Sequence, residues 1–120
     1  MFVKNINDCT KFTANDGCQI QEWLHPKNDN INLPYSIAIA TVDVGQHSYK
    51  HKLEQAEVYL INTGRGLMHI DDEQKEVKAG DAIYIEPSRT QWIENIADEV
   101  LIFIAIVNPP WSEEGDKRLD

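Results

Sequence analysis

The sequence has few cysteines, few positive charges and no long apolar run. Its 120 residues include two cysteines, and 11 lysines and arginines stand against 20 acidic residues, which gives a net charge of −9. So acidic a surface repels phosphate backbones and anionic lipids, and we therefore expect neither nucleic acid nor a membrane as a partner. No stretch approaches the roughly 20 apolar residues that a membrane-spanning helix needs.

Targeting and catalytic motifs are also missing. Residues 1–12 lack the apolar core of a signal peptide, so we expect a cytoplasmic protein whose Cys9 and Cys18 are free thiols. A Cys9–Cys18 disulfide is the alternative if residues 9–18 form a hairpin. The sequence contains neither a nucleophile elbow nor a phosphate-binding loop that opens a helix.

Short apolar runs separated by turn residues organise the chain, and one of the turns is predicted at residues 14–17. The runs are residues 18–24, 35–44, 56–62, 66–70, 75–78, 81–85, 91–95 and 100–107. Strands of this length and spacing predict a single all-β domain, an antiparallel sandwich or barrel. No interval has a helical period long enough for a major helix.

Two of the predicted strands carry apolar residues on both faces. Residues 100–107, VLIFIAIV, are apolar throughout, and Val58 and Leu60 face away from Glu57 and Tyr59 on the neighbouring run. A barrel has one interior, so the outward apolar side chains need a cover. We therefore predict a homodimer whose contact includes residues 100–107 and the face that carries Val58 and Leu60.

Two segments carry a recognisable pattern of glycine, histidine, glutamate and proline. Residues 45–64 read GQHSYKHKLEQAEVYLINTG, and residues 80–95 read GDAIYIEPSRTQWIEN. They resemble the two motifs of the cupin family, written G-x5-H-x-H-x3,4-E-x6-G and G-x5-P-x-G-x2-H-x3-N. EWLHP, GRGLMHIDDE and NPPWSEE extend the resemblance, which covers residues 20–115 approximately. It implies that residues 1–120 form one double-sheet jelly-roll barrel, with an acidic tail at residues 111–120.

The same resemblance implies a divalent metal held inside the barrel by three histidines and a glutamate. The residues at those four positions are His51, Leu53, Glu57 and Gln91, and Ser88 replaces a glycine of the second motif. Leucine donates nothing, and an amide oxygen is a weaker ligand than imidazole. We therefore expect His51, Glu57 and Gln91 to hold one transition metal (Fe, Mn, Ni or Zn) weakly. A metal-free pocket, in which these three side chains hydrogen-bond to one another, is the alternative.

Further side chains are candidates for the same pocket. His47 shares the parity of His51 on an extended segment and is a candidate ligand, with the pocket rim or solvent as the other placement. Leu53, Tyr59 and Asn95 are expected to line the pocket.

Three functions are open, and the fold does not choose among them. One is a metal-dependent enzyme that acts on a small polar molecule, either sugar-like or carboxylated. The second is a non-catalytic dimer that binds a small molecule without metal. The third is a chiefly structural dimer whose pocket is vestigial.

Overall fold

The computed structural model describes residues 1–13 and 18–120, so the turn predicted at residues 14–17 lies outside the described part of the chain. One short 3₁₀ helix, η1 (Ile6–Asp8), precedes the strands. The strands are β1 (Lys11–Thr13), β2 (Gln19–Leu24), β3 (Ser36–Val42), β4 (His51–Leu53), β5 (Ala56–Thr63), β6 (Arg65–Ile70), β7 (Glu73–Lys78), β8 (Ala82–Ile85), β9 (Thr90–Asn95), β10 (Leu101–Asn108) and β11 (Asp116–Arg118).

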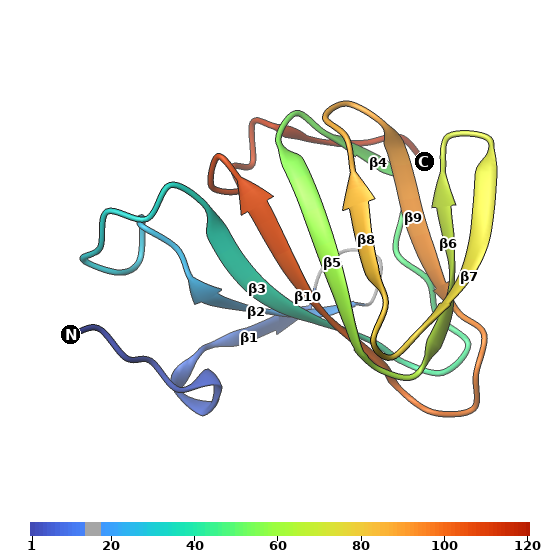
Figure 1. Cartoon of the computed structure of the whole chain (residues 1–120), viewed down its shortest axis with the longest axis horizontal. Coiled ribbons are helices and arrows are strands. Elements are labelled where there is room, and N and C mark those ends of the chain that lie inside the picture. The colour runs from blue at the N-terminus through green and yellow to red at the C-terminus, as the bar shows by residue number, and fades with distance from the viewer. Residues whose placement is uncertain (14–17) are drawn as a thin grey trace.

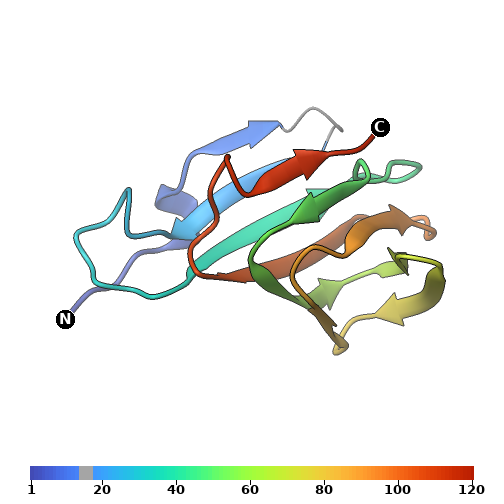
Figure 2. The same cartoon turned by 90° about the horizontal axis from the view of Figure 1, so that it is seen from above.

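The strands form two facing sheets (Figures 1 and 2). The six-stranded sheet has the order β1-β2-β3-β10-β5-β8, and the five-stranded sheet has the order β11-β4-β9-β6-β7. Every strand pair is antiparallel. The all-β jelly-roll prediction is confirmed, and each predicted run corresponds to one strand. Among the described residues, no helix has the length and apolar character needed to cross a membrane.

Alternation of side chains along the strands builds the core between the sheets. Tyr59 and Ile61 of β5 and Phe103 of β10 point inward from one sheet, and Met68 and Ile93 point inward from the other, all at most 5% exposed. Because successive side chains of a strand point to opposite faces, the residues between them lie on the outer faces. The core fixes which residues of each strand can reach the interior.

The turn between β5 and β6 requires glycine. Gly64 has φ +89°, and a Cβ atom there would lie 2.6 Å from the backbone oxygen of Val100. Only glycine combines a left-handed conformation with so close a backbone approach. This turn allows the consecutive strands β5 and β6 to enter opposite sheets.

The three strands that the sequence analysis did not predict have three residues each, too few to show a period. β4 carries His51, and β11 pairs with it in the register His51–Arg118 to Leu53–Asp116. The acidic carboxyl-terminal segment is thus part of the five-stranded sheet (Figure 2). Cys9 and Cys18 are both buried, and neither is in a disulfide.

Candidate functional site

A cavity of about 180 Å³ lies between the sheets, bounded by β1–β5, β10 and the carboxyl-terminal segment. Five aromatic and three acidic side chains are among those that line it, together with His51. They are Phe12, Tyr49, Tyr59, Phe103 and Trp111, and Glu22, Glu57 and Asp116. This volume is roughly that of six water molecules in the liquid, so only a small ligand fits into the cavity.

His51 is brought to the cavity by the short strand β4. β4 pairs with β9 so that His51 lies opposite Gln91. The Nδ1 atom of His51 lies 3.1 Å from the carbonyl oxygen of Tyr49. Because a carbonyl only accepts, Nδ1 carries the hydrogen and the lone pair is on Nε2. The imidazole therefore offers a hydrogen-bond acceptor or a single metal-ligand atom at the cavity wall.

Three buried side chains form a hydrogen-bonded chain across the barrel. The Tyr59 hydroxyl donates to Gln91 Oε1 at 2.9 Å, and Gln91 Nε2 donates to Glu57 Oε1 at 3.0 Å. Their exposed fractions are 5%, 1% and 7%, respectively. Tyr59 and Glu57 come from β5, and Gln91 comes from β9 on the opposite sheet. These two hydrogen bonds hold the side-chain amide of Gln91 in one orientation, with its nitrogen toward Glu57.

The electrostatics of this chain favour a neutral carboxyl group. Burial raises the pKa of Glu57 to about 8; the hydrogen bond from Gln91 opposes the rise and the negative charge of Asp116 adds to it. At neutral pH Glu57 is therefore mainly protonated. A protonated carboxyl can donate a hydrogen bond to a ligand, which a carboxylate cannot do.

The predicted metal ligands do not form a donor set suited to a tightly bound transition metal. Gln91 Oε1 already accepts from Tyr59, and the other end of the amide is a donor. Leu53 lines the cavity with hydrocarbon and is 2% exposed. Within residues 1–13 and 18–120, no three His, Cys, Asp or Glu side chains lie close enough to hold a metal ion. One imidazole and one acid that must first lose its proton make a poor site. The assignment of His51, Glu57 and Gln91 as ligands stays a prediction that this geometry does not favour.

The other predicted site residues divide between the cavity and the rest of the barrel. Leu53 and Tyr59 line the cavity. Asn95 instead bonds to the end of β3 and to the loop after β9: its Nδ2 donates to the Val42 and Glu99 carbonyl oxygens, and its Oδ1 accepts from Ala97 N. Asn95 is not among the residues that line the cavity.

His47 lies on the outer side of the five-stranded sheet. His47 is exposed, and its ring packs edge-to-face with the Trp92 ring, with 5.6 Å between the centroids. Its backbone forms an isolated antiparallel β-bridge with Glu94. Trp92 also stacks on His69, with the ring centroids 3.7 Å apart. His47 therefore takes the solvent-side placement that the sequence analysis left open.

The carboxyl-terminal segment supplies two cavity residues that the sequence analysis did not name as site residues. Trp111 Nε1 donates to Asp116 Oδ2 at 3.1 Å. Asp116 Oδ1 is buried and has no hydrogen-bond partner among residues 1–13 and 18–120. His25 Nε2 donates to the Trp111 carbonyl oxygen at 2.8 Å, and Gln55 donates to Pro110 O and Ser112 Oγ. These contacts hold the segment against the barrel. No local pattern in the acidic tail marks Asp116 out from its neighbours.

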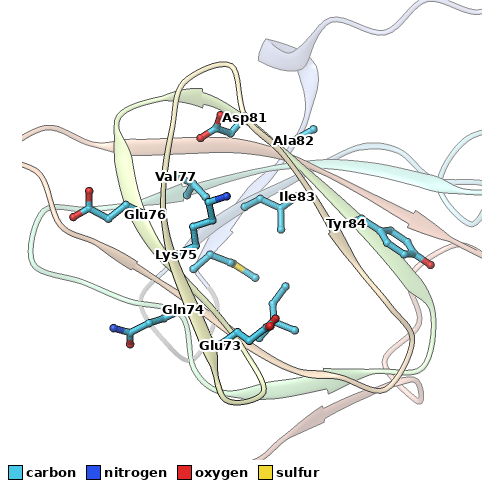
Figure 3. A pocket seen from close by; sticks show the side chains of 11 residues that line it. Glu73, Gln74, Lys75, Glu76, Val77, Asp81, Ala82, Ile83 and Tyr84 are labelled. Carbon is cyan, nitrogen blue, oxygen red and sulfur yellow. The ribbon is translucent and has the colours of Figure 1, made fainter.

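A larger and more open groove of about 630 Å³ lies between β7 and β8 (Figure 3). Its floor is apolar and includes Met68, Val77 and Ile83, while charged side chains such as Glu73 and Lys75 lie along β7. The floor belongs to the core, and the described residues that line the groove include no histidine or cysteine. Because polar groups do not converge there from several elements, we place the functional site in the smaller interior cavity.

Comparisons with known proteins agree with this fold. Residues 38–107 match the model of the cupin domain. The uncharacterized protein MJ1618 of Methanocaldococcus jannaschii is 41% identical over 110 residues, which are 91% of this chain and 87% of that protein.

Solved structures with a similar fold include cupins of different sizes. Oxalate decarboxylase of Lactobacillus farciminis, in complex with formate, has a TM-score of 0.83 at 22% identity over 94% of this chain, which spans only 34% of that enzyme's chain. A cupin 2 conserved barrel domain protein of Salinispora arenicola has a TM-score of 0.76 at 21% identity, with 95% and 91% of the two chains covered. A variant of Streptomyces PAC13 with uridine has a TM-score of 0.79 at 14% identity, with 100% and 92% covered.

At these identities the solved structures show the shared fold alone. The match to the cupin domain model covers more than half of the chain, and the archaeal relative is similar along nearly its whole length. The chain belongs to the cupin family.

Proposed function

We propose that the protein binds a small polar organic molecule in its interior cavity and does so without a tightly held metal ion. The orientation of the Gln91 amide is the observation that supports this proposal most strongly. The amide oxygen of Gln91 accepts a hydrogen bond from the Tyr59 hydroxyl, and the amide nitrogen donates to Glu57. Two of the positions at which the cupin motifs imply metal ligands, Glu57 and Gln91, are thus joined to Tyr59 in a hydrogen-bonded network beside the cavity.

The cavity offers distinct polar contacts to such a ligand. His51 Nε2 is an acceptor, protonated Glu57 is a donor, and the Asp116 side chain adds a carboxylate to the cavity wall. Aromatic rings supply apolar surface around these groups. A few convergent polar groups in an otherwise apolar cavity are typical of small-molecule sites. Two related folds contain small ligands, formate in one and uridine in the other.

A metal-dependent enzyme is the second candidate, because His51 and Glu57 are both retained. It requires Glu57 to lose its proton and the Gln91 amide to turn over, which breaks both hydrogen bonds of the network. Each of these changes weakens metal binding, so we rank this function second.

A ligand-observed NMR screen of small polar molecules tests the proposed function. We expect compounds that bind the wild type to lose binding in Ala105→Leu, because Ala105 lines the cavity and the added carbons fill it. Ala79→Leu, a matched change at an exposed turn residue, should leave binding intact. Compounds that bind both variants equally would contradict a ligand site in this cavity.

We also propose that the protein is a homodimer. Ile104 of β10 lies opposite Ile39 on β3 and Leu60 on β5, all on the outer face of the six-stranded sheet. Leu60 is 37% exposed and Tyr84 on β8 is 63% exposed. A stable dimer buries about 800 Å² of each partner, and an apolar face that crosses β3, β10, β5 and β8 suits a two-fold symmetric contact.

The mass in solution tests the dimer, measured by size exclusion with light scattering. We expect Ile104→Glu to give a monomer, because it places a charge at the centre of the apolar face. Leu67→Glu is the matched control on the outer face of the other sheet and should stay dimeric. A wild-type protein that is monomeric at micromolar concentration would refute the dimer.

A further inference from the structure

The interior cavity has a one-sided charge. Among the described residues, those that line it include Glu22, Glu57 and Asp116 and no lysine or arginine. The Glu22 side chain is paired with Lys27 at 3.3 Å, and Glu57 accepts a hydrogen bond from Gln91 Nε2 at 3.0 Å. Asp116 forms no ion pair with any described residue. The Asp116 carboxylate therefore lines the cavity without a positive partner, which disfavours the carboxylated ligand that the sequence analysis considered.

Asp116 is also held in place with one oxygen unused. Trp111 Nε1 donates to Oδ2 at 3.1 Å, so the carboxylate cannot turn freely. The other oxygen, Oδ1, is buried and has no hydrogen-bond partner among the described residues. A carboxylate at the wall of a cavity without a positive partner focuses a negative potential into the cavity, and this potential attracts a positively charged ligand. This uncompensated charge is the feature that points to the charge of the ligand.

The aromatic side chains favour the same kind of ligand. Phe12, Tyr49, Tyr59, Phe103 and Trp111 reach the cavity from separate elements. Aromatic faces attract cations through the quadrupole of the ring, and cages of aromatic rings are the usual way in which proteins recognise quaternary ammonium groups.

Two of these rings already interact with cations of the chain itself. Lys27 Nζ lies 5.2 Å from the centre of the Trp111 ring, and the Arg118 guanidinium lies 4.7 Å from the centre of the Tyr49 ring. Neither Lys27 nor Arg118 lines the cavity, so these pairs leave the Asp116 carboxylate without a positive partner inside it.

We infer that the cavity receives a small organic cation, an alkylammonium of about the size of choline, with Asp116 as its charge partner and the aromatic rings as its walls. This inference rests on the proposed function, since it names the ligand class of the same cavity. A volume of about 180 Å³ limits the ligand to this size. Binding of such a cation requires neither a metal ion nor a covalent reaction with the protein.

Calorimetric titration of the full-length protein with three probes of matched shape tests the inference. The probes are choline, the uncharged alcohol 3,3-dimethylbutan-1-ol, in which carbon replaces the nitrogen of choline, and the corresponding carboxylate, 3,3-dimethylbutanoate. We expect choline to bind at least about tenfold more tightly than the alcohol, because only choline is attracted as a cation to the aromatic faces and the carboxylate. The carboxylate should not bind.

A variant that removes the charge of Asp116 tests whether this residue is the charge partner of choline. Asp116→Asn keeps an oxygen for Trp111 and removes the charge, so we expect choline affinity to fall about tenfold or more while binding of the alcohol is unchanged. Glu114→Gln, an exposed acid on the same segment, is the control and should change neither. Thermal unfolding of both variants checks that they are folded.

The outcomes separate this inference from the proposed function. Equal binding of choline and the alcohol, or unchanged choline binding in Asp116→Asn, overturns the cation while leaving a ligand cavity. If none of the three probes binds, the inference is overturned, and the NMR screen with Ala105→Leu still decides on the cavity itself.

Discussion

Substitution of Glu57 by glutamine should remove a pH dependence of stability that this one residue causes. Burial raises the pKa of Glu57 from 4.5 to about 8 in the folded protein, with the hydrogen bond from Gln91 opposing the rise and the charge of Asp116 adding to it. Between these values the folded chain keeps a proton that the unfolded chain has released. Stability is therefore fully present below about pH 4.5 and falls as pH rises toward about 8.

The size of the effect follows from the same numbers. A shift from 4.5 to about 8, at about 1.36 kcal/mol for each pKa unit, gives about 5 kcal/mol as an upper limit. Water that enters the cavity beside the ionised group reduces the cost, so we expect the wild type to lose about 2–5 kcal/mol across this range. Glu57→Gln should show a nearly flat profile because its amide can still accept from Gln91 and carries no charge.

Urea unfolding at a series of pH values measures the difference. Glu54→Gln, an exposed neighbour, is the control and should follow the wild type. Carboxyls with lowered pKa, such as Asp71 bonded to Arg89, lose their contribution only as pH falls through 3.8 and below, outside this window. Parallel profiles for wild type and Glu57→Gln between about pH 5 and about pH 8 would refute a buried, protonated Glu57.

Three further predictions concern the network, the turn and the lost metal ligands. Tyr59→Phe leaves the buried Gln91 oxygen without its donor and should cost about 1–3 kcal/mol in urea unfolding; no loss would mean that the hydrogen bond is absent. Gly64→Ala should destabilise by more than Gly80→Ala, since both glycines have positive φ but only at Gly64 would the new Cβ meet a backbone oxygen, at 2.6 Å; equal melting temperatures would contradict this. The double change Leu53→His and Gln91→His should raise zinc affinity in calorimetry by about 100-fold or more, and unchanged affinity would show that these positions do not converge.

The fold could be predicted because its signals are distributed along the chain. Runs such as residues 56–62 and 100–107 are long enough to show strand character, and both are strands in the structure. The motif glycines also mark real turns, since Gly45 and Gly64 have positive φ. β4 and β11 were missed because three residues do not establish a period, and their pairing depends on contacts distant in sequence.

The site could be predicted only in part. The positions of His51 and Glu57 in the first motif place both at the cavity, as the structure does. The spacing of Gln91 predicts that it meets Glu57, and the two are hydrogen-bonded at 3.0 Å. What spacing cannot give is the direction in which the amide points, because Tyr59 decides that from another strand. Asp116 was missed for a similar reason: it reaches the cavity only because the final segment folds back onto β4.

Metal binding by the wild-type protein, prepared without a histidine tag, tests the central claim most directly. Calorimetric titration with zinc, manganese, nickel and ferrous iron should show no saturable binding in the micromolar range. Gln91 stands at the fourth ligand position of the two motifs, and its amide nitrogen donates to Glu57 instead of offering a lone pair to a metal. Stoichiometric binding at micromolar or lower concentration, abolished by His51→Ala, would contradict the account and return the cavity to metal chemistry.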